Sequence, residues 1–565
     1  MDTALKQQRF AIENGALTRL GPPEGTAFLG RPVPLWEVTL RHRDGAEASF
    51  RAQDFPQEET SAGRLSWRPR FGGEGRCRVV VTIDEETDGA LSWRIAVDEL
   101  PADWTVARVR FPCFDWKLEA TDRYKMVIPE DRGRQVVNPL VNLPDLTELW
   151  QRRRFRERKY PNNFATMQCL GLICGDDLLY FAAHDPTPVV KNIYFEPDAA
   201  SETIRLRPMV ETGWRYGEPY ASFPWVTALD KGDWFDVARR YRKFALTAPW
   251  TQAGPLEESD KTPRWLQDAP MILLRHYRGD MHDADALLKV AAYMQVPLVL
   301  HYYMWQQSAH DANYPFLFPA TPEFRAELKR LQEAGIRVIP YIDTYSADTC
   351  IDEWLGMEAL AVRKNPQQEL HAQVWSQNRA LAAICPAHPL AGRIASLVAL
   401  RCVEMGVDGL YFDELGCSPA HNCYAANHGH VVGDERAFVA GHRRTLAAIR
   451  QEAREIRPDF VMATEGCPET YLDLIDTYLA GNENLVNEVP LFEAVYHDYV
   501  TTYGQYMFCE EFYEPRFKDA LFGKVARQFV SGAKFAWSRI PMVAMGSICT
   551  ITGFSQPSHL PWRVE

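Results

Sequence analysis

Two short apolar stretches with acids at or near their ends, VDGLYFDE (407–414) and DFVMATEG (459–466), decide the fold class of this chain. Between them lies ERAFVAGHRRTLAAIRQEAREI (435–456), a long stretch with the pattern of a helix. A strand, a helix and a second strand in this order form a βαβ unit, in which the two strands run parallel. The pattern therefore predicts a parallel sheet with helices packed against it.

The same alternation of strand and helix extends on both sides of this unit, over residues 262–558. The further predicted strands are 269–277, 296–305 and 336–345, with helices at 284–294, 321–335 and 390–406. Three later strands are less distinct and are placed at 474–481, 494–504 and 547–554. So many βα units in one segment favour a closed (β/α)8 TIM barrel over an open sheet.

The N-terminal part of the chain has a different rhythm. Short apolar runs such as RCRVVVTI (76–83) and TIRLRPMV (203–210) alternate with turns rich in Gly, Pro and Asp, which is typical of antiparallel strands. The polar, proline-containing stretch TQAGPLEESDKTPRW (251–265) then marks a boundary. We expect two domains, an antiparallel β-sandwich over 1–255 and a catalytic barrel over 262–558.

Composition limits the partners and the location. The chain carries 62 Lys and Arg against 75 Asp and Glu, a formal charge of −13, which argues against nucleic acid as a partner. It contains no apolar run long enough to span a membrane, and its first residues lack the apolar core of a secretion signal. A cytoplasmic location is expected, or a secreted or periplasmic one if a leader has been removed. The oligomeric state is not predicted.

In a TIM barrel the chemistry lies at the carboxyl ends of the strands. The residues expected there, in chain order, are His301, Tyr303, Trp305, Asp343, Tyr345, Asp413, Glu465, His497 and Asp498. Aromatic rings beside acids suit a sugar, whose C–H faces stack on rings and whose hydroxyls bond to carboxylates. A carbohydrate substrate is therefore the predicted partner.

Strand alternation selects one acid from each of the two stretches. Asp413 shares a face with Gly409 and Tyr411, while Glu414 shares the opposite face. Glu465 shares a face with Ala463 in the same way. If the small residues point into the barrel, both acids point to its mouth as neighbours. The alternative for each acid is a helix cap or a salt bridge, and Glu414 is expected to be structural.

The loop that follows Asp413 is rich in cysteine and histidine. Cys417, His421, Cys423, His428 and His430 are residue types that bind zinc, but their spacing matches no standard zinc motif. We therefore expect no metal and no cofactor. His428 and His430 are predicted instead to contact sugar hydroxyls, with a purely structural loop as the alternative.

These motifs carry a family resemblance. The chain resembles the retaining TIM-barrel α-glycosidases, especially the endo-α-N-acetylgalactosaminidase-like group. The resemblance lies in three motifs: DGLYFDE (408–414) with an aspartate near its end, ATEG (463–466) with its glutamate, and the loop CYAANHGH (423–430). The resemblance implies that Asp413 is the nucleophile, that Glu465 is the acid/base, and that a β-sandwich precedes the barrel.

The sequence therefore predicts a retaining glycoside hydrolase, and more narrowly an α-glycosidase that works by double displacement. A β-glycosidase or an inverting enzyme on the same barrel is the nearest alternative. A carbohydrate-binding protein without activity and a metal-dependent hydrolase are the alternatives from other classes.

Overall fold

The computed structural model describes residues 10–20, 28–61, 63–143, 157–275, 284–374, 379–480, 487–504 and 518–536. The chain forms two compact units. The first consists of Met1–Pro249, Pro419–Val439 and Val486–Val495, and the second of Trp250–Ser418, Ala440–Leu485 and Tyr496–Glu565. The long N-terminal segment of the first unit thus ends next to the polar link at 251–265. The sequence analysis did not foresee that two later segments belong to the first unit.

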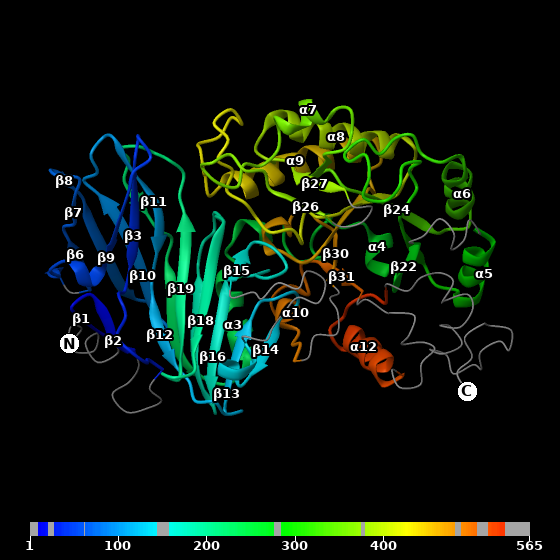
Figure 1. Ribbon diagram of the computed structural model, residues 1–565. Helices are drawn as coiled ribbons and strands as arrows, with labels where there is room; N and C mark the ends of the chain where they lie inside the picture. The colour runs from blue at the N-terminus through cyan, green and yellow to red at the C-terminus, as the bar shows by residue number, and fades with distance from the viewer. Residues whose placement is uncertain are drawn as a thin grey trace. The chain divides into compact units, whose positions relative to one another are not determined.

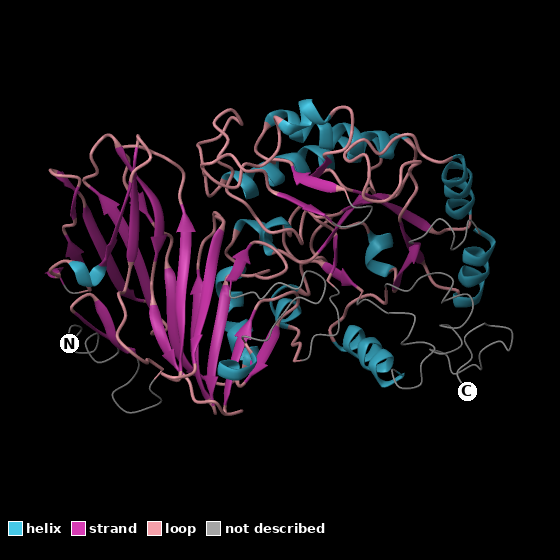
Figure 2. Ribbon diagram, viewed as in Figure 1, coloured by secondary structure: helices cyan, strands magenta, loops and turns pink. Residues whose placement is uncertain are grey.

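The first unit contains two large antiparallel sheets (Figure 2). One has the order β14 (Arg134–Val137), β13 (Tyr124–Ile128), β16 (Cys169–Cys174), β17 (Asp177–Ala183), β21 (Trp225–Lys231), β10 (Leu91–Asp98), β9 (Arg78–Glu85), β6 (Arg64–Trp67) and β5 (Glu58–Ser61), with β20 (Tyr220–Ala221) beside β10. The other has the order β15 (Glu157–Tyr160), β18 (Lys191–Asp198), β19 (Thr203–Glu211), β11 (Trp104–Arg110), β3 (Glu37–His42) and β4 (Glu47–Arg51), with β12 (Phe114–Lys117) beside β19.

A single apolar core joins these two sheets. It includes inward-facing residues of both, for example Trp36 beside β3 and Trp67 in β6, whose rings meet edge to face at 5.4 Å. Trp93 in β10 is also buried, and its indole N–H donates to the Thr227 hydroxyl at 2.9 Å. Two antiparallel sheets that share one core form a sandwich, as the sequence predicted for this part of the chain.

The second unit is built on a seven-stranded parallel sheet (Figure 1). Its strands follow one another in chain order: β22 (Met271–Arg275), β23 (Leu298–Tyr302), β24 (Arg337–Ile342), β28 (Gly409–Phe412), β29 (Val461–Glu465), β30 (Thr477–Leu479) and β31 (Thr501–Tyr503). Sequential order in a parallel sheet is the arrangement of a barrel.

The sheet nearly closes on itself. Isolated parallel bridges join Lys534 to Tyr503 of β31 and Phe535 to Met271 of β22. Two backbone hydrogen bonds support them, from Lys534 N to Thr502 O at 2.8 Å and from Ile272 N to Phe535 O at 2.9 Å. This pair of residues occupies the position of an eighth strand. The strand predicted at 547–554 lies outside the described residues, so eight full strands remain a prediction.

The helices between the strands lie on the outside of this sheet (Figure 1). They are α5 (Ala284–Met294), α6 (Pro322–Glu333), α8 (Pro389–Glu404) and α9 (Ala437–Ile456), close to the predicted ranges. Helix α6 begins where Thr321 accepts a hydrogen bond from Phe324 N and Pro322 occupies the first turn. None of the helices in the described ranges combines the length and apolar character needed to cross a bilayer.

Smaller elements complete both units. They are β1 (Phe10–Glu13), β2 (Ala16–Leu20), β7 (Arg70–Phe71), β8 (Gly75–Arg76), α2 (Pro139–Asn142), α3 (Trp234–Ala245), α4 (Arg264–Asp268), α10 (Leu491–Tyr496) and α12 (Lys518–Val530), and a small antiparallel sheet of β25 (Ser346–Asp348), β27 (Ala380–Ala383) and β26 (Ala372–Val374) with α7 (Trp354–Glu358). The strand predicted at 494–504 is wrong in its first half, because helix α10 extends to Tyr496 and β31 begins only at Thr501.

Gly409 explains how β28 fits among its neighbours. A Cβ atom at this position would lie 2.5 Å from the Val461 carbonyl oxygen and 2.9 Å from Ile339 Cγ2. Only glycine leaves room for this close approach of strands β24, β28 and β29. The expected crowding on the face that Gly409 shares with Asp413 is confirmed.

Candidate active site

Asp413 and Glu465 lie side by side at the carboxyl ends of two neighbouring strands. Strands β28 and β29 pair in parallel with Gly409 opposite Val461 and Phe412 opposite Thr464. Asp413 follows β28 directly, and Glu465 is the last residue of β29. One oxygen of each carboxyl group lies within 4.8 Å of the other. The alternation of side chains along the two strands thus correctly predicted that these acids are neighbours.

The Tyr411 hydroxyl connects the two acids. It lies 3.2 Å from Asp413 Oδ1 and 3.3 Å from Glu465 Oε2. A phenol carries one proton, so it can donate to only one of these carboxyls. Both contacts are hydrogen bonds when Tyr411 donates to an ionised carboxylate and accepts from a protonated carboxyl. The geometry therefore suits an acid pair that holds one proton.

The electrostatics of Asp413 point the same way. Burial raises the pKa of the Asp413 carboxyl well above its usual value, and the neighbouring Glu465 and Glu414 carboxylates add to the rise. A hydrogen bond from Tyr341 opposes it and lowers this pKa. Several acids close together cannot all be ionised at low cost, so protons are retained here near neutral pH.

Hydrogen bonds favour Asp413 as the ionised member of the pair. Tyr341 and Tyr411 both donate to it, and the Tyr411 hydroxyl also contacts Glu465 at 3.3 Å. The Tyr341 hydroxyl itself accepts from Tyr314 at 3.1 Å, and Tyr314 accepts from Asp311 N at 3.0 Å. This chain of donors begins at a backbone amide and ends on the Asp413 carboxylate, which it stabilises.

Aromatic rings line the same end of the barrel. His301 is fully buried, and its ring centroid lies 4.0 Å from that of Tyr411. Tyr303 lies between His301 and Tyr341, at 4.7 and 4.6 Å. Burial raises the pKa of Tyr303, and the nearby charges of Asp413 and Glu465 raise it further. This predicted contact residue therefore lies beside the acid pair. The structure brings His301 and Tyr303 to the site.

Trp305 has a different environment. It is fully buried, its indole N–H donates to the Tyr341 carbonyl at 2.6 Å, and its ring packs on Phe318 and Phe324. These contacts favour a packing role, and a sugar contact by Trp305 remains a prediction. Tyr302 faces the other way, as expected, since its hydroxyl donates to Glu327 of helix α6 at 2.7 Å.

Asp343 and Tyr345 follow strand β24. The Asp343 carboxylate accepts from the backbone N–H groups of Tyr345 at 2.8 Å and Ser346 at 3.0 Å, which is a turn-forming role. Burial raises its pKa to about 7. Tyr345 is buried, and its ring lies 5.8 Å from that of His442. Of the two alternatives for Asp343, these contacts favour the scaffold.

Glu414 points away from Tyr411. It accepts from Ser418 Oγ and lies 3.4 Å from Gln373 Nε2, and its backbone has a left-handed φ of 61°. Burial, followed by the charge of Asp343, raises its pKa to about 8. These contacts fit the structural role that the sequence suggested.

His497 and Asp498 are not at the strand end where the sequence placed them. They precede β31, so they lie at its amino end, whereas Asp413 and Glu465 lie at carboxyl ends. His497 is exposed, and the Asp498 carbonyl accepts from Leu256 N at 2.7 Å. This placement corrects the sequence analysis. The error came from reading the helical turn of α10 as part of a strand.

His428 and His430 lie in the segment Pro419–Val439 of the first unit. His428 is buried and hydrogen-bonds to Cys423, while His430 is half-buried. Their predicted contact with sugar hydroxyls remains a prediction.

The site also contains Tyr411, Tyr341 and Cys417, and Tyr503, whose ring lies 6.4 Å from that of His301. The sequence analysis selected none of them as a catalytic or substrate-contact residue. Tyr411 could have been found, because it lies two residues before Asp413 on the same strand face. Cys417 Sγ lies within 4.8 Å of a carboxylate oxygen of each acid, and burial followed by the charges of Glu465 and Glu414 raises its pKa well above the usual value. A thiol held neutral in this way can donate to either carboxylate.

The structural class of this protein is now defined. It combines a sandwich unit with a nearly closed parallel barrel, and two adjacent strand ends of the barrel carry an acid pair. Its membership of a family follows from comparison: residues 220–508 match the family described as a domain of unknown function, DUF6259, and the chain belongs to it.

Two curated relatives carry a functional name. The chain is 26% identical over 453 residues to a protein of Bacteroides thetaiotaomicron named "Putative glycoside hydrolase", which covers 78% of this chain and 64% of that protein. It is 25% identical over 440 residues to "Putative glycoside hydrolase 22789" of Monosiga brevicollis, covering 68% of this chain and 36% of that protein. The chain thus spans less than two thirds of either relative.

Solved structures of the α-N-acetylgalactosaminidase NagBb from Bifidobacterium bifidum are similar in fold. The complex with GalNAc superposes with a TM-score of 0.66 at 14% identity, over 87% of this chain and 82% of that one. A quadruple mutant gives 0.69 at 13% identity, over 95% and 90%. At such identities the likeness establishes the shared fold. Together these relatives confirm the resemblance to glycosidases that the sequence motifs carry.

Proposed function

We propose that this protein is a retaining glycoside hydrolase with Asp413 as nucleophile and Glu465 as acid/base. The observation that carries the proposal is the distance between the acids, whose nearest oxygens lie within 4.8 Å. Retaining enzymes hold their two carboxyls about 5–5.5 Å apart, whereas inverting enzymes need roughly 6.5–9.5 Å to admit a water. The short separation therefore supports attack by the protein itself.

The two acids divide the reaction between them. The Asp413 carboxylate attacks the anomeric carbon while Glu465 transfers its proton to the departing glycosidic oxygen. Glu465, now ionised, takes a proton from a water molecule, and the water oxygen attacks the anomeric carbon of the glycosyl ester on Asp413. The ester bond breaks, Asp413 leaves as a carboxylate, and Glu465 is protonated again.

The hydrogen bonds around the pair support this division. Asp413 must be ionised to attack, and the Tyr341 and Tyr411 hydroxyls stabilise its charge. Glu465 must carry a proton, and its contact with Tyr411 at 3.3 Å allows it to donate to the phenol oxygen in the resting state. One proton between the two acids is the starting state that double displacement requires.

The substrate class is proposed from the resemblance in the motifs and from the fold shared with NagBb. Both favour an α-linked sugar, and α-N-acetylgalactosaminides are the first compounds to examine. The rings of His301 and Tyr303 lie beside the acids, where a pyranose would present its C–H face.

A screen of aryl α- and β-glycosides, beginning with α-N-acetylgalactosaminide and α-galactoside, tests this function. We expect hydrolysis of an α-glycoside, with NMR showing the α-anomer of the free sugar as the first product. A first product of opposite configuration would establish an inverting mechanism and contradict the proposal. Binding of sugars without turnover of any activated glycoside would favour the carbohydrate-binding alternative.

Tyr411→Phe tests the link between the acids. Loss of a hydrogen bond to a charged group costs about 1.5–3 kcal/mol, so kcat/KM should fall roughly 10–100-fold. Tyr411 stabilises the ionised form of Asp413, and its removal raises the Asp413 pKa. Activity depends on that ionised form, so the acidic limb of the pH profile of kcat/KM should move to higher pH.

Tyr302→Phe is the matched control for this experiment. It removes a phenol from the adjacent part of the barrel, but that hydroxyl bonds to Glu327 on the outer face. The control should lower the melting temperature without moving the acidic limb. An unchanged pH profile in Tyr411→Phe would show that the phenol does not tune the acid pair.

A further inference from the structure

The segment Pro419–Val439 leaves the second unit a few residues after Asp413 and is anchored in the first. Glu435 accepts from Gly213 N at 2.7 Å and pairs with Arg215 at 3.1 Å, and Asp434 pairs with the same guanidinium at 2.6 Å. Asn422 donates to the Glu211 carbonyl at 2.9 Å. These contacts hold both ends of a short loop, 423–430, in a defined position.

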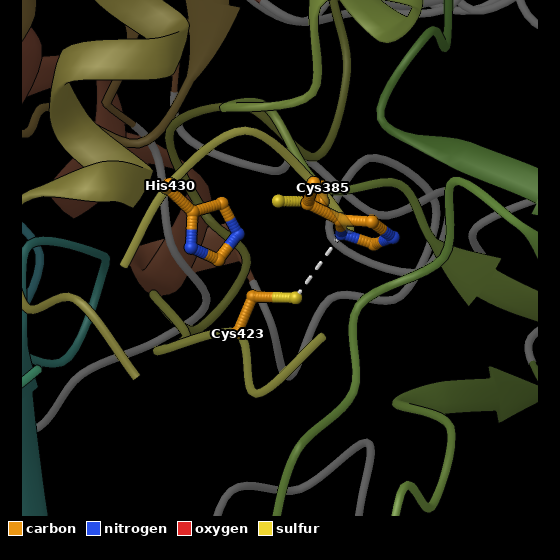
Figure 3. Close-up of side chains that lie close together, drawn as sticks. Cys385, Cys423 and His430 are labelled. Atoms are coloured by element: carbon orange, nitrogen blue, oxygen red, sulfur yellow. Dashed lines mark hydrogen bonds between the residues drawn. The ribbon is translucent and has the colours of Figure 1, made fainter. Parts of the chain in front are cut away.

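Three metal-ligating side chains of this loop converge. Donor atoms of Cys423, His428 and His430 all lie within 4.8 Å of one another. Cys423 and His428 are buried, with exposed fractions of 2% and 1%. Figure 3 shows the side chains of Cys423 and His430 close together. Cys423 Sγ also hydrogen-bonds to His428 Nδ1.

The separation of these atoms fits a tetrahedral metal. Zinc binds thiolate sulfur at about 2.3 Å and imidazole nitrogen at about 2.0–2.1 Å, so a tetrahedral angle places the two ligand atoms about 3.5 Å apart. Cys423 Sγ and His428 Nδ1 lie 3.4 Å apart. The same distance also suits a hydrogen bond from the thiol. A third ligand atom nearby is therefore needed to favour a metal site over a simple hydrogen bond.

His430 supplies that third ligand atom, and its ring is held by the backbone. Its Nδ1 lies 2.7 Å from the Val431 carbonyl oxygen, to which only a protonated nitrogen can donate. With the proton on Nδ1, a neutral His430 ring carries its lone pair on Nε2, and this is the nitrogen that can ligate a metal. Ligating histidines commonly donate their other ring N–H to a carbonyl in this way.

We propose that Cys423, His428 and His430 bind a zinc-type transition metal ion. Sulfur and imidazole ligands in a tetrahedral arrangement select zinc among the common divalent ions. On binding, the Cys423 thiol loses its proton to solvent and its sulfur forms the bond to the metal, in place of the hydrogen bond to His428. The ion cross-links the loop that follows the Asp413 strand.

This proposal revises the expectation of a metal-free loop. The spacing of Cys423, His428 and His430 matches no standard motif, but ligands need only meet in space, and the ion pairs of Arg215 hold this segment in place. Asp413, Cys417 and Glu465 also lie within 4.8 Å of one another. That second group consists of the proposed catalytic acids and a thiol, so it belongs to the site already described.

Metal analysis of the tag-free protein, purified without chelator and dialysed against zinc, tests the proposal. We expect about one tightly bound zinc per chain, lost in Cys423→Ser and His428→Ala and retained in the exposed-cysteine control Cys350→Ser. Cys417→Ser should also retain zinc. A protein without zinc after this dialysis, or zinc lost with Cys417→Ser and kept with Cys423→Ser, would overturn the proposal.

Cobalt substitution and thermal melting give independent readouts. Co²⁺ bound to a thiolate shows a near-ultraviolet charge-transfer band, which should appear in the wild type and be absent in Cys423→Ser. A chelator should lower the melting temperature of the wild type and leave that of Cys423→Ser unchanged. If Cys423→Ser does not fold, His430→Gln, at a half-buried position, replaces it in both measurements. A cobalt spectrum without the charge-transfer band would contradict thiolate ligation.

Discussion

Replacement of Asp413 by alanine is expected to lower turnover of every glycoside substrate roughly 10⁵-fold or more, because loss of a nucleophile removes the covalent pathway itself. Asp413 follows β28, where the Tyr341 and Tyr411 hydroxyls direct protons at its carboxylate. Activated and natural glycosides should therefore be affected alike, as kcat measurements on both would show.

Azide turns this loss into a diagnostic result. Azide can enter the space left by the Asp413 carboxylate and attack the anomeric carbon, so the alanine variant should yield a glycosyl azide of inverted configuration. Glu414→Gln is the matched control, since the adjacent acid faces Ser418 and Gln373 instead of Tyr411. Near-normal turnover by Asp413→Ala would exclude it as the nucleophile, and equal losses in both variants would weaken its assignment.

Replacement of Glu465 by alanine is expected to act through the leaving group. Natural glycosides, whose oxygen needs a proton to depart, should lose roughly 10²–10⁴-fold in kcat/KM. Dinitrophenyl or fluoride glycosides depart without help, so they should still form the covalent intermediate. Its hydrolysis should then be slow because Glu465 no longer activates water, and a burst followed by a low steady rate should be seen.

Azide again separates the two acids. In Glu465→Ala it should attack the intermediate on Asp413 and give a glycosyl azide of retained configuration, opposite to the product of Asp413→Ala. Equal losses of Glu465→Ala on natural and activated substrates would show that this residue does not protonate the leaving group.

The sequence could predict the acid pair because two local rules act together. Strand alternation places Asp413 on the face of Gly409, and parallel pairing sets Gly409 opposite Val461. Both rules depend on near neighbours in the chain or on adjacent strands. The prediction that Asp413 and Glu465 are neighbours therefore needed no information about long-range contacts.

Other parts of the site depend on contacts that no local pattern reveals. Trp305 stands at a strand end in the sequence, but Phe318 and Phe324 from the following segment cover its ring. His497 and Asp498 were misplaced because an apolar run of about ten residues suits a strand or a helix equally. The proposed metal site was missed because Cys423 and His430 are brought together by the conformation of a loop, which no local sequence pattern predicts.

The division into units was also only partly predictable. The polar link at 251–265 marks a boundary by its composition, but nothing local marks Pro419–Val439 as part of the first unit. Its membership rests on ion pairs such as that of Arg215 with Glu435, whose partners are far apart in the sequence. Pattern analysis has no access to such pairs.

The late segments of the first unit have a consequence for biosynthesis. Arg132 is almost fully buried, and its counter-charges, Glu488 and Glu493, belong to the segment Val486–Val495. While the ribosome is still translating the barrel, the sandwich therefore lacks the two carboxylates that pair with Arg132 in the finished protein. The first unit to be translated is thus among the last to be completed, and the nascent chain depends on its own later residues for a finished N-terminal half.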